Sequence, residues 1–141
     1  MKQKIKPKLL KSIDLASGLK LELYDTSIKV AGDRWLVALT AIIDIIVDET
    51  IIVAQGHFNG NEIKEILGEV VRFEQKRERH FIDKKDKDNV LQNLMDSFLM
   101  SSLSYLSHLD FAKKYVLKVF KNHLVRKTWY PEKQNSAVGS L

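Results

Sequence analysis

The segment Arg-Trp-Leu-Val-Ala-Leu-Thr-Ala-Ile-Ile-Asp-Ile-Ile-Val, residues 34–47, decides the fold of this 141-residue chain. Its β-branched and aromatic side chains favour an extended strand. Successive side chains of a strand point to opposite faces, and both faces of this one are largely apolar. We therefore predict the central strand of a sheet, with a helical layer or a second sheet over at least one face. The segment is longer than most strands, so we expect it to bend around the helical layer.

The composition of the whole chain is that of one globular domain, with 45% hydrophobic and 29% charged residues. The chain contains no cysteine, which excludes disulfides, thiolate metal sites and cysteine catalysis. The basic first residues lead into no apolar segment of a secretory signal. The central apolar segment is shorter than the roughly 20 residues of a membrane-spanning helix. We therefore expect a soluble, cytoplasmic protein that does not bind membranes.

The charge of the chain is unevenly distributed. The net charge is +5, and the isoelectric point is near 9.3. Residues 33–69 carry 7 acidic and 2 basic residues, whereas residues 1–32 carry 3 acidic and 7 basic ones. The basic ends permit attraction to a polyanion without requiring one.

Alternating apolar residues predict further strands on either side of the central one. Residues 19–23 alternate between leucine and polar side chains, as in a half-buried strand. At residues 25–27 the alternation changes parity, and a β-bulge with one extra residue would produce this change. After the central strand, Ile51–Gln55 is predicted to return as the third strand of an antiparallel meander.

The next segment combines a short helix with an ambiguous continuation. Residues 61–67 have helical apolar spacing, with Asn59 or Asn61 as N-cap and Gly68 as a C-terminal stop. Residues 70–80 could prolong this helix, because Glu, Gln, Lys and Arg all tolerate helices. They could equally form a fourth strand, and the valine pair after Gly68 favours the strand.

Two amphipathic helices complete the pattern. A 3.6-residue apolar period predicts a long helix over residues 90–103, and a second helix follows the break at residues 107–110. We therefore predict an α+β fold: an antiparallel meander of three to four strands with one inserted helix and a C-terminal helical pair packed on one face. We assign residues 1–17 to a basic N-terminal arm, 18–127 to a single α+β domain and 128–141 to a C-terminal tail.

No group of residues has the spacing of a catalytic, nucleotide or metal site. The four histidines are scattered, and no His-Glu-x-x-His, Gly-x-Gly-x-x-Gly or Gly-x-Ser-x-Gly motif occurs. We therefore predict no catalytic residue, no metal and no cofactor, and we favour a binding protein over an enzyme.

The central strand contains the first candidate binding residues. Asp44 lies among apolar residues, where a carboxylate must be paired or reach water, or else its pKa rises. Thr40 shares its face, which favours a solvated carboxylate. Arg34 and Trp35 begin the strand beside Asp33, and such a trio either builds a small anion-binding or interface patch or fastens the end of a hairpin.

The other candidates lie later in the chain. Arg77, Arg79 and His80 form a basic stretch interleaved with glutamates, which cross-strand pairing explains without a ligand. Trp129 and Tyr130 are aromatic anchors near the C-terminus. We predict a non-enzymatic protein-interaction or regulatory module that binds a protein partner or self-associates. The alternative is nucleic-acid binding through the basic N-terminal arm and the last helix, which salt dependence would reveal.

Overall fold

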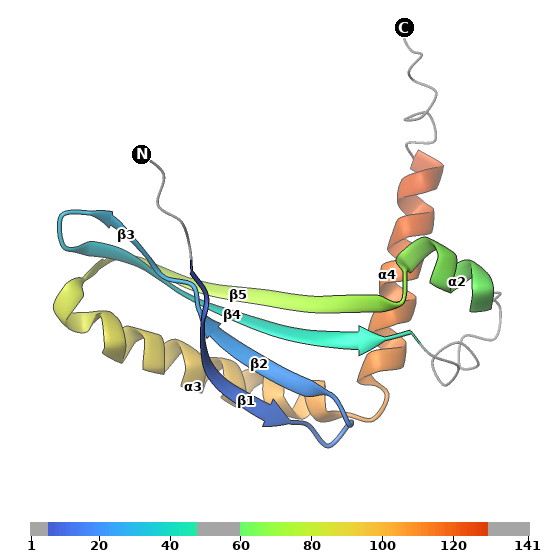
Figure 1. The fold of residues 1–141 in the computed structure, drawn as a ribbon, viewed down its shortest axis with the longest axis horizontal. Coiled ribbons are helices and arrows are strands. Elements are labelled where there is room, and N and C mark those ends of the chain that lie inside the picture. The colour runs from blue at the N-terminus through green and yellow to red at the C-terminus, as the bar shows by residue number, and fades with distance from the viewer. Residues whose placement is uncertain (1–5, 48–59, 130–141) are drawn as a thin grey trace, which may run out of the picture. The chain divides into compact units, whose positions relative to one another are not determined.

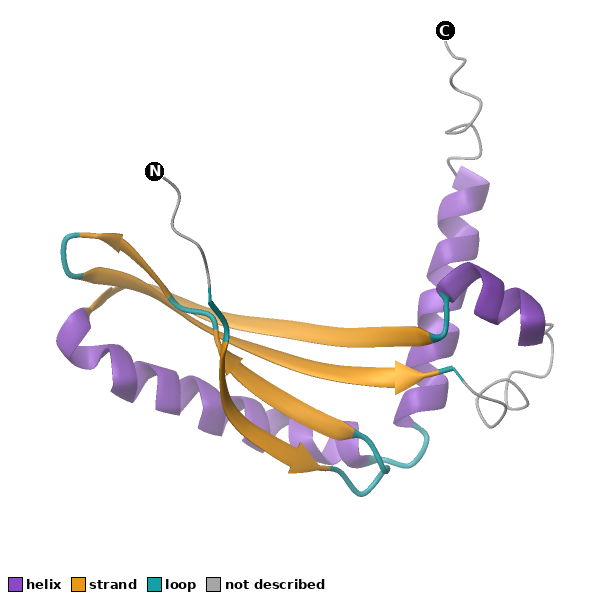
Figure 2. Cartoon of the chain, viewed as in Figure 1, coloured by secondary structure: helices purple, strands orange, loops and turns teal. Residues whose placement is uncertain are grey.

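The structure is a computed structural model that describes residues 6–47 and 60–129 (Figures 1 and 2). It has the predicted α+β fold, with a sheet, one short inserted helix and two C-terminal helices. The predicted strand Ile51–Gln55 lies outside the described residues. The described strands are β1 (Lys8–Asp14), β2 (Lys20–Asp25), β3 (Ile28–Ala31), β4 (Arg34–Ile46) and β5 (Val70–Asp83), and the helices are α2 (Gly60–Leu67), α3 (Lys87–Ser107) and α4 (Phe111–Trp129), with one 3₁₀ turn (Lys84–Asp86).

Contacts divide the chain into two compact units. The first comprises residues 1–45 and 72–111, and its described part contains β1 to β3, most of β4 and β5, and α3. The second comprises residues 46–71 and 112–141, and its described part contains α2 and most of α4.

The strands form one sheet in which β1, β2, β4 and β3 are neighbours in that order. β1 pairs with β2, and both β2 and β3 pair with β4. β5 pairs with the other side of β4. The Lys84 amide donates to the Asp33 carbonyl and the Val47 amide to the Glu69 carbonyl, each at 2.9 Å, so β5 runs antiparallel to β4. The strand interpretation of residues 70–80 is therefore confirmed, and the strand continues to Asp83.

Strand β1 lies within the segment that we assigned to a basic arm. It pairs from Lys8 opposite Asp25 to Asp14 opposite Lys20, so opposite charges meet at both ends of the ladder. Its lysines obscure the strand pattern in the sequence, but lysine is common on edge strands because it discourages pairing with other chains.

The predicted β-bulge at residues 25–27 is wrong. Asp25 lies opposite Leu39 and Ile28 opposite Leu36, so β2 and β3 follow β4 in one uninterrupted register. The Thr26 amide continues the ladder by donating to the Ala38 carbonyl at 3.0 Å. The change of parity instead places Ile28 on the face opposite the buried leucines of β2, and the register shifts only between Lys29 and Ala31.

One face of the curled sheet in the first unit is covered by α3, and we call it the covered face (Figure 1). We call the other face the open face. On the covered face, Leu21 and Leu23 of β2 are fully buried, as is Phe98 of α3. The covered face also includes alternate residues of β4, all at most 1% exposed: Val37, Leu39, Ala41, Ile43 and Ile45.

The helices begin and end close to the predicted residues. α2 ends at Gly68, whose φ of +87° only glycine adopts freely, and the Gly68 amide donates to the Lys64 carbonyl at 2.8 Å. In α4, Val116 and Phe120 are fully buried. Within residues 60–129, no helix combines the length and apolar character needed to span a membrane.

Candidate functional site

The open face contains a groove with a volume of about 400 Å³. Its side chains come from three neighbouring strands at positions that the β2–β4 register and the β4–β5 pairing bring to the same face. The groove is lined by Pro7 before β1, Glu22 and Tyr24 of β2, Thr26, Thr40 and Ile42 of β4, and Arg72, Glu74 and Lys76 of β5.

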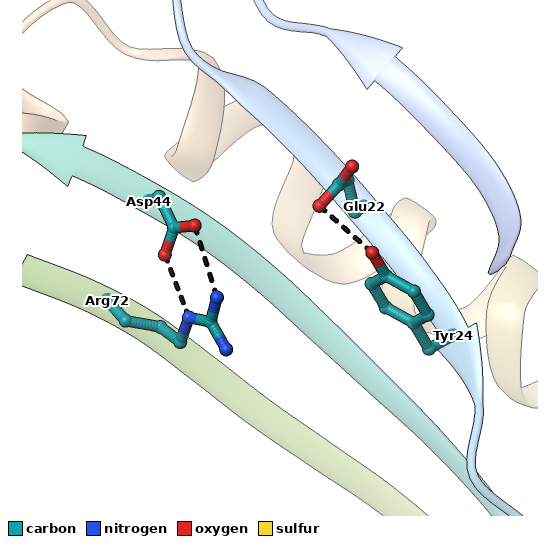
Figure 3. A network of polar contacts seen from close by, with 4 residues as sticks. All are labelled: Glu22, Tyr24, Asp44 and Arg72. Carbon is teal, nitrogen blue, oxygen red and sulfur yellow. Dashed lines mark hydrogen bonds and ion pairs between the residues drawn. The ribbon is translucent and has the colours of Figure 1, made fainter. Parts of the chain in front are cut away.

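Asp44 and Arg72 form a bidentate ion pair at one end of this face (Figure 3). Arg72 donates from Nε to Oδ1 at 2.8 Å and from Nη2 to Oδ2 at 3.2 Å. The hydrogen bonds from Arg72 lower the pKa of Asp44 below its ordinary value of 3.8. Asp44 is therefore a paired carboxylate on a solvent-facing strand surface, and it does not have the raised pKa of a buried acid.

Tyr24 and Glu22 form a second polar pair beside the first (Figure 3). The Tyr24 hydroxyl donates to Glu22 Oε1 at 3.1 Å. Desolvation raises the pKa of Tyr24, and the hydrogen bond to Glu22 raises it further. The tyrosine therefore stays protonated at neutral pH, where it serves as a hydrogen-bond donor and not as a base.

The middle of the groove is less polar. The hydroxyls of Thr26 and Thr40 hydrogen bond to each other at 2.8 Å, and Thr40 is only 4% exposed. Ile42 contributes apolar surface between charged residues of both signs. This arrangement suits binding, because a small apolar area flanked by fixed polar groups gives both contact area and orientation.

Arg34 lies at a different place, where β4 begins and β5 ends. Its Nη1 is 3.1 Å from Asp83 Oδ2, and its guanidinium lies 6.0 Å from the centre of the Phe81 ring. The hydrogen bond from Arg34 lowers the pKa of Asp83. Arg34 thus fastens the ends of two neighbouring strands, the second of the two roles that we considered for it.

Phe81 carries a backbone irregularity next to this pair. Its φ is +60°, and its side chain is 72% exposed. A positive φ is unfavourable for a bulky residue with a β-carbon, so this position is strained.

Trp35 follows Arg34 but belongs to the covered face. Lys87 Nζ of α3 lies 4.8 Å from the centre of the Trp35 ring and 3.7 Å from Asp25 Oδ2. The indole Nε1 of Trp35 is buried and has no hydrogen-bond partner within the described structure. The tryptophan therefore helps to seat the first turn of α3.

The basic residues of β5 divide between the two faces and the strand end. Arg77 lies over the Phe98 ring at 5.3 Å and donates to Ser101 Oγ at 3.4 Å. Arg79 donates to the Glu78 carbonyl at 3.0 Å, and His80 Nε2 is 3.9 Å from Glu78 Oε1. Within the described structure, Arg77 therefore contacts α3, whereas Arg79 and His80 contact Glu78.

The remaining candidates are not in the described part or are described only in part. Trp129 is the last residue of α4, its side chain is outside the described structure, and Tyr130 is outside it altogether. The structure thus distributes the candidate residues over several places, and only Asp44 lies beside the groove.

The groove residues Tyr24 and Ile42 were missed by the sequence analysis. The signal that could have found them is register: Tyr24 lies opposite Thr40 and Glu22 opposite Ile42, on the face to which Asp44 belongs. The sequence does not reveal this register, because the parity change at residues 25–27 fits equally a β-bulge that would shift the pairing by one residue.

The described residues contain no group of three or more His, Asp or Glu side chains that could hold a metal ion. The chain matches no protein-family model, no curated protein and no solved structure.

Proposed function

We propose that the protein is a non-enzymatic protein-interaction module whose open-face groove binds an extended segment of a partner protein. The observation that carries this proposal is the composition of the groove: an apolar centre at Ile42 between charged side chains of both signs. Its volume lies within the range of ligand-binding sites.

The charged residues favour a peptide over a small anion or cation. Arg72 is engaged by Asp44, so this pair presents no uncompensated charge to a small ion. The Glu22 carboxylate accepts a hydrogen bond from Tyr24 but keeps its negative charge, which does not favour a small anion. Glu74 and Lys76 place opposite charges two residues apart on one strand face. A partner segment with one apolar side chain between charged ones would match both the centre and the margins.

A random-peptide library displayed on phage tests this proposal against the purified full chain. We expect enrichment of peptides whose binding is lost in Ile42→Arg and reduced in Tyr24→Ala. Val30→Arg is the matched control, because Val30 is an exposed apolar strand residue that does not line the groove. Peptides that bind Ile42→Arg as well as they bind the wild type would contradict the proposal.

A second candidate, nucleic-acid binding, is favoured by the charge of α4. Residues 111–129 include six lysines and arginines and no acidic residue. Lys114, Lys118 and Lys121 are exposed at helical spacing, as on a surface that contacts phosphates.

Fluorescence anisotropy with a generic DNA oligonucleotide distinguishes the two candidates. If α4 neutralises phosphates, the affinity should fall steeply with salt, and Lys118→Glu should weaken it for every sequence. Binding that is absent, or that does not change with salt, would exclude this candidate and leave the groove as the functional surface.

A further inference from the structure

We infer that strand β5 pairs edge to edge with β5 of a second copy of this chain, forming a two-fold symmetric dimer with a continuous sheet. β5 is 14 residues long, and within the described structure it pairs only with β4. An edge strand of this length presents backbone groups that another strand can bind.

The hydrogen-bond pattern indicates which backbone groups face outward. The Val47 amide donates to the Glu69 carbonyl, so that pair is of the hydrogen-bonded kind. The opposition of Asp44 and Arg72 keeps this register at residue 72, and the alternation of Glu74 and Lys76 in the groove with Arg77 over Phe98 of α3 continues it to residue 77. The Lys84–Asp33 hydrogen bond is one residue out of this register, so the shift lies between Arg77 and Lys84. Because such pairs alternate in an antiparallel ladder, residues 72, 74, 76 and 78 direct their amides and carbonyls away from β4.

The side chains of these same four residues alternate in charge. Arg72 and Lys76 are positive, whereas Glu74 and Glu78 are negative. In the chain direction the charges run positive, negative, positive, negative. In an antiparallel second copy they run in the opposite order, so each positive charge can lie opposite a negative one. An antiparallel partner with the identical sequence can therefore place an opposite charge against every one of them.

The complementarity favours one register, because a two-fold axis at Gln75 forms four opposite-charge pairs, whereas an axis at Phe73 or Arg77 forms only two. With the two-fold axis at Gln75, Glu74 faces Lys76 of the second copy, and Arg72 faces Glu78 of the second copy. These are outward-directed residues on both strands, so they also form the hydrogen-bonded pairs. An axis at Glu74 or at Lys76 would instead place two like charges directly opposite each other.

The resulting interface is closed and involves only the first unit over residues 72–78. An isologous contact of this kind joins two copies and stops, since each edge is used once. Arg72, Glu74 and Lys76 contribute side chains both to this edge and to the open-face groove, whereas Ile42 belongs to the groove alone. Ile42→Arg changes the groove without changing the edge, so the two proposals can fail independently.

Sedimentation velocity of the full chain at low and high salt tests the inference. The wild type should dimerise, and the dimer should weaken as salt increases. Glu74→Lys and Lys76→Glu should each replace two attractive pairs by two repulsive ones, raising the dimer dissociation constant roughly tenfold to a hundredfold. Circular dichroism should show that both variants remain folded.

Mixing the two single variants gives the decisive measurement. Glu74→Lys carries only positive charges at positions 74 and 76, and Lys76→Glu only negative ones, so an equimolar mixture should form a heterodimer. The double variant E74K/K76E should dimerise again by itself. Lys64→Glu and Glu65→Lys on exposed positions of α2 are the matched controls and should dimerise like the wild type.

Three results would each overturn the inference. One is a wild type that stays monomeric at all accessible concentrations, as it would if another segment of the chain covered this edge. The second is single variants that dimerise as well as the wild type. The third is a mixture of the two single variants that stays monomeric.

Discussion

The covered and open faces of the sheet use the same strands, and both faces of β4 are largely apolar, yet they form different surfaces. Ile42 and Ile43 are neighbours in β4, but Ile43 is completely buried on the covered face, whereas Ile42 is partly exposed in the groove. Two apolar faces on one strand therefore do not imply two buried layers. The partner that each face meets decides which side becomes core.

The neighbours of these two isoleucines explain the difference. Ile43 shares its face with the buried leucines of β2, and α3 covers that face. Ile42 lies opposite Glu22, with the charged residues of β5 nearby. The covered face supplies stability, whereas the open face leaves polar and apolar groups accessible.

The largest expected effect compares these two isoleucines directly. Ile43→Ala should lower the free energy of unfolding by about 2–5 kcal/mol, because it removes methyl groups from a closely packed core. Ile42→Ala should cost only about 1 kcal/mol, since part of that side chain already contacts water. Urea unfolding of both variants checks the prediction, and equal losses would show that the open face is covered in solution.

A comparison of two ion pairs should give a smaller effect. Lys87 and Asp25 are only 20% and 15% exposed, and the Lys87 ammonium also lies over the Trp35 ring. Lys87→Ala should therefore destabilise the protein by about 1–2 kcal/mol.

Arg72 and Asp44 on the open face are 54% and 46% exposed, so Arg72→Ala should cost less than Lys87→Ala. Thermal unfolding at low and high salt tests both variants. As salt increases, the unfolding temperature of the Arg72 variant should approach that of the wild type, whereas that of the Lys87 variant should stay lower. A larger loss for Arg72→Ala would mean that the open-face pair is shielded from solvent.

At Phe81 the two faces should not matter, because the backbone conformation, and not the packing of the side chain, determines how a substitution changes the free energy of unfolding. Phe81→Gly should be about 1 kcal/mol more stable than Phe81→Ala, since glycine adopts the φ of +60° without strain. Within a regular strand the order would be the reverse. Chemical unfolding of the two variants distinguishes these cases, and a more stable alanine variant would contradict the strained conformation.

The smallest effect concerns pH. The pKa of Asp44 is lower in the folded protein than its ordinary 3.8. Its contribution to stability is therefore complete above about pH 4 and is lost as the pH falls through the folded-state pKa. Asp44→Asn and Arg72→Gln should both flatten this part of the curve of unfolding free energy against pH. If neither variant changes the slope, the pair does not form in solution.

The sequence predicts the architecture more successfully than the site. The long apolar segment at residues 34–47, the helical stop at Gly68 and the break at residues 107–110 all appear where periodicity and local conformational preference place them. Each of these features depends on residues close together in the chain. Local patterns of this kind are visible without knowledge of the tertiary structure.

The features that were missed depend on pairing between distant residues. β1 is stabilised by the facing of Lys8 with Asp25 and of Asp14 with Lys20, which its own sequence does not indicate. The groove depends on the register that joins Glu22 to Ile42 and on the ion pair across 28 positions between Asp44 and Arg72. The sequence singles out Asp44 as an acidic residue among apolar ones, but only its contact with Arg72 shows that it is one half of an ion pair.

Because β2 and β3 follow β4 in one register, an insertion or deletion between them would disrupt the strand pairing. Residues 25–27, Asp-Thr-Ser, have the composition of a turn that would accept insertions, yet the Ser27 hydroxyl accepts a hydrogen bond from the Ala38 amide and holds the segment in line. One inserted residue would move Lys29 to the open face and Ile28 to the covered face, so β3 would present the wrong side chains on both faces. Insertions and deletions should therefore be tolerated at the Gly32 turn and selected against at residues 25–27.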